Sequence, residues 1–244
     1  MHFILIIIRR QLGVSNNSLE WTPKQLCQEW KHDRTITEDP DIPPNYSRVF
    51  AGGNTSFCFD RKNRCYTWGL DILRCSKAEP KRSGVSFAST RSIIPYPQLV
   101  ELFTFPVKEM AIGDQHVLAL DNEGNVYAAG SNTKGQCATT GDFVKEFVKV
   151  DVPAGMTGVF AVGAVSGCFG PAGMYMWGDN ENTLMAVFAD KTEEMKPKMV
   201  PAVSNVTKVA VSGTHIMVMC ELPTNKREAE EEIQTEAKKV KVDA

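Results

Sequence analysis

The sequence lacks the patterns that mark a nucleotide-hydrolysing enzyme or a membrane protein. No G-x-x-x-x-G-K-[ST] phosphate loop occurs in its 244 residues, which argues against a protein that itself hydrolyses nucleotides. The apolar run Phe3–Ile8 is far shorter than the ~20 residues that a membrane-spanning helix needs. Arg9-Arg10 follow this run, whereas the charges of a signal peptide precede its apolar core. We interpret the run as a buried strand or as an end that does not belong to the natural fold.

Paired cysteines and a net charge of one sign are also missing. The seven cysteines are an odd number and contain no Cys-x-x-Cys pair, which argues against a disulfide framework and a zinc site and fits a reducing compartment. The 27 basic and 29 acidic residues leave a net charge of -2, so no field of the whole molecule would draw it to nucleic acid or membrane. We therefore expect no metal, no cofactor and no membrane partner.

Residues 1–45 are expected to be an N-terminal extension that is partly helical or irregular. Thr22-Pro23 has the form of a helix start, with threonine as the N-cap and proline in the first turn. Leu26 and Trp30 would share one face of that helix. We therefore expect Trp30 to serve packing rather than binding.

Four related segments follow this extension. They begin at Ala51, Ala111, Ala161 and Ala210, at spacings of 60, 50 and 49 residues. Each contains glycine within three residues and reaches serine or histidine five residues after the alanine, at Ser56, His116, Ser166 and His215. In three copies a turn and an aromatic strand ending in glycine come next. We expect the repeated glycines to mark bulges or close approaches of neighbouring backbones, at Gly53, Gly69, Gly113, Gly130, Gly163, Gly178 and Gly213.

The copy at residues 111–136 shows the strand pattern most clearly. Alternating apolar residues lie on both sides of the turn Asp121–Gly124, as in a hairpin with at least one buried face. A repeat of about 50 residues built from short strands with glycine and aromatic residues is typical of a β-propeller blade. Trp68 and Trp177 would then be large apolar side chains packed between blades. Asp60 and Asp121 follow a strand and are expected to stabilise turns.

These repeats resemble those of a known family. A-x-G-x-x-H, a hairpin, V-Y-A-A-G-S-N and then Gly135-Gln136 are similar to the repeat of the regulator of chromosome condensation family, which includes the guanine nucleotide exchange factor for Ran. The resemblance covers about Val49 to Leu222, and the order of the copies resembles the last blades of that exchange factor. It implies an all-β, seven-bladed propeller.

This chain would supply about half of such a ring, because it holds roughly three full blades and partial ones. The expected repeats are 46–60, 61–120, 121–170 and 171–222, followed by a tail at 223–244. We interpret the chain as the C-terminal half of a longer protein.

The resemblance also implies where a partner would bind. Exchange factors of this family place histidines of this repeat position, together with acidic residues, on the propeller face that contacts Ran. His116, His215, Asp114 and Gln115 are therefore candidate contacts with a Ran-type GTPase. The alternative from the residues alone is that each imidazole ties down a neighbouring loop by hydrogen bonds.

The implied function is GDP release by protein contact, with no covalent chemistry. Half of the ring is expected to exchange nucleotide poorly alone. The alternative function is a non-exchanging propeller scaffold or interaction module of the same superfamily. The resemblance also implies that chromatin would be bound through regions that this chain does not contain.

The tail at 223–244 is rich in Glu, Lys and Ala and is expected to be disordered or a frayed helix. Two basic clusters ten residues apart have the spacing of a bipartite nuclear import signal, formed by Lys226, Arg227, Lys238, Lys239 and Lys241. A solvated charged tail is the alternative. We expect a nuclear protein that binds importins through this tail, with the cytoplasm as the other location.

Overall fold

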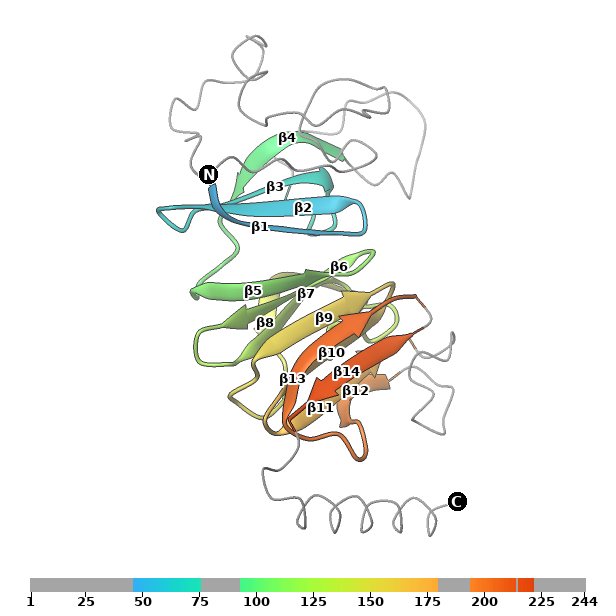
Figure 1. Cartoon of the computed structure of the whole chain (residues 1–244). Coiled ribbons are helices and arrows are strands. Elements are labelled where there is room, and N and C mark those ends of the chain that lie inside the picture. The colour runs from blue at the N-terminus through green and yellow to red at the C-terminus, as the bar shows by residue number, and fades with distance from the viewer. Residues whose placement is uncertain (1–45, 76–92, 180–193, 214, 222–244) are drawn as a thin grey trace, which may run out of the picture.

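The computed structural model describes residues 46–75, 93–179, 194–213 and 215–221 (Figure 1). In these ranges the chain forms β-strands and no helix, and therefore no helix that could cross a membrane. The strands make three four-stranded antiparallel sheets and one two-stranded sheet. The expected strand Phe3–Ile8, the helix near Trp30 and the tail lie outside the described residues.

Each sheet is a meander in which strands consecutive in the chain are neighbours. The first blade contains β1 (Tyr46–Gly52), β2 (Thr55–Asp60), β3 (Cys65–Leu70) and β4 (Ile93–Val100). The second blade contains β5 (Val107–Ile112), β6 (His116–Asp121), β7 (Val126–Ser131) and β8 (Phe143–Lys149). The third blade contains β9 (Gly158–Val162), β10 (Val165–Gly170), β11 (Gly173–Gly178) and β12 (Glu194–Met199). The half blade contains β13 (Val206–Val211) and β14 (Ile216–Cys220).

The blades stack face to face along the chain. The first strands meet in sequence, because β1 contacts β5, β5 contacts β9 and β9 contacts β13. Figure 1 shows the same succession from the blue sheet to the orange and red one. First strands that line a common inner edge are typical of propeller blades around an axis. The predicted all-β partial propeller is confirmed.

The sequence repeats and the blades are offset by two strands. Each of the repeats 61–120, 121–170 and 171–222 begins with the third strand of one blade and ends with the second strand of the next. Every repeat therefore links two neighbouring blades through the covalent chain.

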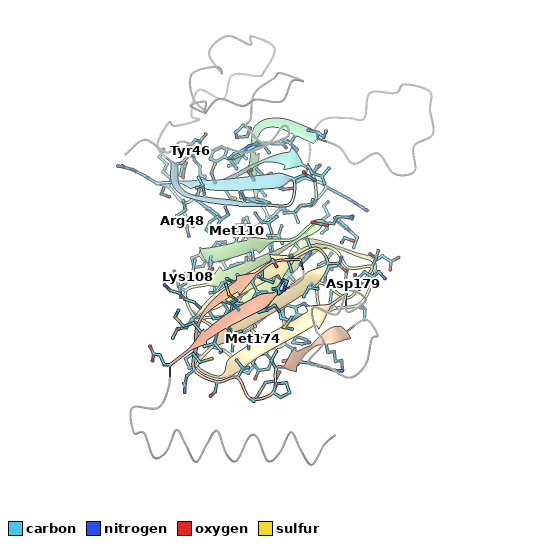
Figure 2. The ribbon with its side chains drawn as sticks, turned by 45° about the vertical axis from the view of Figure 1, so that its right-hand side comes forward. Tyr46, Arg48, Lys108, Met110, Met174 and Asp179 are labelled. Atoms are coloured by element: carbon cyan, nitrogen blue, oxygen red, sulfur yellow. The ribbon has the colours of Figure 1, made fainter. Side chains whose placement is uncertain are left out.

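Three of the four core clusters are layers between blades. Strand β6 is buried along its whole length. Its Val117 and Ala119 face the first blade, where Phe57 and Phe59 lie, and its Leu118 and Leu120 face the third blade. Arg48 adds a polar link at the first junction (Figure 2), since it donates to the carbonyl of Val107 while its guanidinium lies over the ring of Phe59.

The two tryptophans differ in their surroundings. Trp177 is fully buried in the layer between the second and third blades, as expected of an inter-blade side chain. Trp68 is also buried, but its cluster holds Cys58, Tyr66 and Ile94 of its own blade and no described residue of another blade. The prediction that Trp68 packs between two blades is therefore not tested by the described residues.

Three repeated glycines lie at breaks in strand register. Gly69, Gly130 and Gly178 have φ angles of 93°, 113° and 103°, and the pairing of each with the fourth strand shifts at that point. A Cβ at Gly130 would lie 2.6 Å from the carbonyl oxygen of Gln115. Gly163 and Gly213 differ, because a Cβ at either position would meet nothing within 4 Å.

Candidate functional site

The turns between the first and second strands lie in a row at one end of the blades. We call this row the turn face. Its residues are Gly53-Asn54, Asp114-Gln115, Gly163-Ala164 and Gly213. In each full blade the second residue of the turn accepts a backbone hydrogen bond from the residue after the bulge glycine, at 2.8 Å for Leu70 to Asn54, 2.8 Å for Ser131 to Gln115 and 3.1 Å for Asp179 to Ala164.

Neighbouring turns are also bonded to each other. The backbone N–H of Asp114 donates to the carbonyl of Gly163 over 2.9 Å. Asp114 is exposed and Gln115 is half-buried. This turn therefore presents polar groups to solvent from a backbone that is fixed from two sides.

His116 lies directly behind this turn, at the start of β6, and has no exposed surface. Its Nε2 is 2.8 Å from the hydroxyl of Ser166 in the third blade. That hydroxyl donates its one hydrogen to the carbonyl of Gln136, 2.7 Å away. His116 Nε2 must therefore be the donor, and Nδ1 carries no hydrogen and has no partner among the described residues.

Burial fixes the charge state of this imidazole. Desolvation lowers the pKa of His116 to about 4, because a charged imidazole loses its hydration in this layer. At neutral pH His116 is therefore an uncharged hydrogen-bond donor.

The carbonyl of Gln136 joins the loop of one blade to the sheet of the next. Besides Ser166, it accepts from Nε1 of Trp177 at 3.0 Å. The loop is held in turn by Asn132, whose Nδ2 donates to the carbonyls of Thr139 and Gly141 at 2.7 Å each. Asn132 and the Gly135-Gln136 pair of this copy thus have a structural role.

The structure corrects the expectation for His116. Its side chain is enclosed between two blades, so it cannot touch a partner protein in this conformation. The alternative, a structural hydrogen bond, is closer to what is seen, although the imidazole bonds Ser166 of strand β10 and reaches the loop carbonyl of Gln136 only through that hydroxyl. His215 occupies the corresponding place in the half blade and is exposed. Asp114, Gln115 and His215 therefore remain the candidate contacts.

The structure also corrects the alignment of the repeats. Thr55, His116 and Val165 are the residues that pair with the bulge glycines of their blades. Ser56 and Ser166 therefore lie one position further along their strands than His116 does along its own. A shift of one residue turns a side chain to the other face of a sheet, which is why Ser166 meets His116 instead of replacing it. Sequence reasoning missed this bond.

Asp60 and Asp121 stabilise the turns at the opposite end of the blades, as expected. The carboxylate of Asp121 accepts from the backbone N–H groups of Glu123 and Asn125 at 2.8 and 2.9 Å, and from the side chains of Asn125 and Tyr127. Burial acts to raise the pKa of Asp121, but these hydrogen bonds outweigh it and leave the pKa below the usual value. Neither aspartate belongs to the turn face, and the described residues contain no cluster of three or more metal-ligating side chains.

Residues 107–136 match the family model described as the regulator of chromosome condensation (RCC1) repeat. The protein pim1 of Schizosaccharomyces pombe is 29% identical over 153 residues, which are 62% of this chain and 27% of pim1. The protein RCC1 of Candida albicans is 50% identical over 125 residues, which are 47% of this chain and 26% of that protein. Residues 107–136 of this chain form an RCC1 repeat. The matched region amounts to about a quarter of each of these relatives.

Solved structures show the same fold. Prp20p from Saccharomyces cerevisiae superposes with a TM-score of 0.62 at 18% identity, over 78% of this chain and 47% of Prp20p. Yeast RCC1 (Prp20) bound to Kap60 gives a TM-score of 0.61 at 18% identity, over 78% of this chain and 45% of the other. Human WBSCR16 gives 0.59 at 20% identity, over 72% of this chain and 44% of its own. This chain thus spans less than half of each of these propellers.

Proposed function

We propose that this chain forms part of the binding surface of a guanine nucleotide exchange factor for a Ran-type small GTPase. The observation that carries the proposal is the exposed turn Asp114-Gln115, which is bonded to Gly163 and Ser131 and supported from behind by buried His116. The RCC1-repeat relationship supports it. So does the fold likeness to Prp20p, whose structure is described together with its binding to Gsp1p and histones.

The chemistry proposed for this surface is binding alone. A protein that binds the nucleotide-free GTPase more tightly than the loaded one must weaken nucleotide binding by the same factor. Each tenfold weakening needs ~1.4 kcal/mol of difference in contact energy. A turn held by backbone hydrogen bonds suits this task, because little conformational entropy is lost when it binds. His116 acts as a positioning residue and not as a base.

Release of fluorescent GDP from purified Ran tests the activity. We expect the isolated chain to accelerate release only weakly, since it spans less than half of the related propellers. Rapid release at low chain concentration would contradict the idea that the remaining blades are needed.

Binding to nucleotide-free Ran tests the surface. Asp114→Asn should weaken binding about tenfold, the loss of one charge-assisted contact. Glu146→Gln is the matched control, because Glu146 is an exposed carboxylate on the outermost strand β8, away from the turn face. Equal affinities of the two variants would remove Asp114 from the proposed surface.

The second candidate is a propeller scaffold that does not exchange nucleotide. The burial of His116 favours this scaffold, because the histidine that matches the family motif is not exposed to a partner protein. Tight binding of Ran with unchanged GDP release would support the scaffold and contradict the exchange factor.

We also propose a nuclear location and importin binding through the basic clusters of the tail. The structure of yeast RCC1 with Kap60 supports this for a relative. Alanine at Lys238, Lys239 and Lys241 should move a fluorescent fusion of the chain to the cytoplasm, whereas unchanged nuclear fluorescence would contradict the signal.

A further inference from the structure

The outer face of the half blade is apolar and exposed. Across β13 and β14, Lys208 pairs with Met219 and Ala210 pairs with Met217, and directly opposed residues point to the same face of a sheet. Met217 is 71% exposed and Met219 is 59% exposed. The alternate residues of β14 pack toward the third blade instead. We call the surface formed by Lys208, Ala210, Met217 and Met219 the methionine face.

The methionine face concentrates exposed apolar side chains. Four large apolar side chains are exposed among the described residues, and two of them, Met217 and Met219, lie next to each other here. Single exposed apolar side chains are ordinary, whereas adjacent ones indicate an interaction site. Methionine side chains are flexible and adapt their shape to an apolar partner. This face therefore suits a partner with an apolar stripe.

The tail that follows β14 carries the sequence pattern of an amphipathic helix. Its apolar residues recur at spacings of four, four and three residues, which would place them on one side of an α-helix. They are Ala229, Ile233, Ala237 and Val240. Carboxylates would border this stripe, at Glu230, Glu232 and Glu236. An isolated helix of this length is marginal in water, so the stripe needs a surface on which to pack.

The tail is attached where it can reach the methionine face. It begins at residue 223, three residues after β14 ends at Cys220. Pro223 and Asn225 are residue types that favour turns, so the chain can reverse there. The stripe from Ala229 to Val240 would be ~17 Å long at 1.5 Å per residue, and the five residues of β14 span ~17 Å at 3.4 Å per residue. A helix that lies back along β14 therefore matches its length.

We propose that the tail docks on the methionine face as an amphipathic helix. Ile233, the largest apolar side chain of the stripe, packs on Met217 and Met219. The bordering carboxylates lie beside exposed Lys208, the one cation of this face. The tail of the same chain is the occupant because its charge complements that of the face and because its attachment next to β14 gives it a high effective concentration.

Docking would also orient the basic end of the tail. At 3.6 residues per turn, Lys238 and Lys239 lie on the side of the helix opposite Ile233. The docked tail therefore presents both lysines to solvent at a fixed place on the molecule. The docking is independent of the GTPase proposal and does not require importin binding.

Hydrogen exchange of tail peptides in the full chain tests the docking. Ile233→Glu removes the central apolar side chain and introduces a good helix former. Val242→Glu is the matched control, because Val242 lies on the opposite side of the same helix. Amides from Ala229 to Val240 should exchange at least about tenfold faster in the Ile233 variant than in the wild type, and at an unchanged rate in the control. Equal rates in the wild type and the Ile233 variant would overturn the proposal.

Substitutions on the sheet test where the helix docks. Met217→Glu with Met219→Glu places two carboxylates beneath the stripe, so it should speed exchange of the tail amides at least about tenfold as well. Met199→Glu is the matched control, since Met199 is 51% exposed but lies on β12, outside the methionine face. Far-ultraviolet circular dichroism verifies that each variant is folded. Tail protection that survives the double substitution would overturn the proposal.

Cross-linking tests which chain supplies the helix. Photo-reactive benzoylphenylalanine takes the place of Met219 in an equal mixture of unlabelled and heavy-isotope-labelled chains. Cross-links from this position to tail peptides should join peptides that carry the same label. Cross-links between light and heavy peptides would show that a second copy covers the face, and they would overturn the proposal. Cross-links that never reach the tail would overturn it as well.

Discussion

His116 couples two blades through a neutral hydrogen bond inside an apolar layer. Such a bond contributes about 1 kcal/mol net, but a partner left unsatisfied in the same place costs about 1 to 3 kcal/mol. Ser166 keeps its bond to Gln136 when the imidazole is absent. The loss on removing His116 would therefore come from the cavity and from the missing donor.

Replacing His116 by alanine should lower the free energy of unfolding by about 2 to 4 kcal/mol. The reason is the combined loss of the bond to Ser166 and of packing against the third blade. Urea denaturation at pH 7.5 measures it. His215→Ala is the matched control, because His215 is exposed at the equivalent position and should change stability by less than about 0.5 kcal/mol. Similar losses for both variants would contradict the burial of His116.

The same imidazole should make stability depend on pH. Its folded pKa of about 4 lies below the unfolded value near 6.5, so the unfolded chain binds the proton more readily. The contribution of His116 to the free energy of unfolding is therefore complete above pH 6.5. It is lost as the pH falls toward 4, by about 3 kcal/mol in all.

Urea unfolding at a series of pH values checks this dependence. His116→Gln keeps an N–H donor but does not titrate, so its stability should fall less steeply than that of the wild type between pH 6.5 and 4. Parallel curves for the two proteins would show that His116 is not the titrating group.

The role of His116 could be predicted from sequence only as one of two alternatives. The repeat spacing aligned it with Ser56 and Ser166, and a shift of one residue decides which face of a sheet a side chain occupies. That shift depends on where each hairpin turns, and the short turns Asp114-Gln115 and Gly163-Ala164 do not reveal it in sequence. The turn carboxylates Asp60 and Asp121 were predictable because their bonds are local.

At the scale of the element, the bulge glycine controls how the third strand meets the turn face. Gly130 takes a φ of 113° and pairs with His116. Its Cα approaches the Asp114-Gln115 turn so closely that a Cβ would lie 2.6 Å from the Gln115 carbonyl oxygen and 2.8 Å from the Cα of His116. The bulge therefore sets the position of the exposed turn.

Gly130→Ala should lower the free energy of unfolding by about 3 kcal/mol, the sum of backbone strain and a clash with backbone atoms. Gly141→Ala is the control. It also has a positive φ, of 87°, but a Cβ there would meet nothing within 4 Å, so its cost should be about 1 kcal/mol. Thermal unfolding followed by circular dichroism compares them, and equal costs would mean that close approach has no effect at Gly130.

The strands themselves were predictable because alternation, turn residues and the aromatic-glycine endings all agree in the copy at 111–136. Trp177 also ends an aromatic strand directly before a glycine, and it lies between the second and third blades as predicted. Trp68 ends an equivalent strand and is equally buried, but the described residues of its cluster all belong to its own blade.

At the scale of the whole molecule, burial is least in the half blade, where most residues of β13 and β14 are half-buried or exposed. The second blade is covered on both faces, by the first and third blades. The half blade is covered on one face, and β14 pairs with a described strand only along β13. Local opening should therefore cost least at the half blade, because few buried contacts are lost there.

Hydrogen exchange should follow this order along the chain. Amides of Val117–Leu120 in β6 should exchange at rates that approach those of global unfolding, because both neighbouring strands and both faces must separate first. Amides of Met217–Cys220 in β14 should exchange at least about a hundredfold faster, a difference of roughly 3 kcal/mol in opening free energy. Mass spectrometry of deuterated peptides measures both exchange rates. Equal protection of β6 and β14 would contradict the gradient, because it would require the chain to open as one cooperative unit despite the uneven burial of its blades.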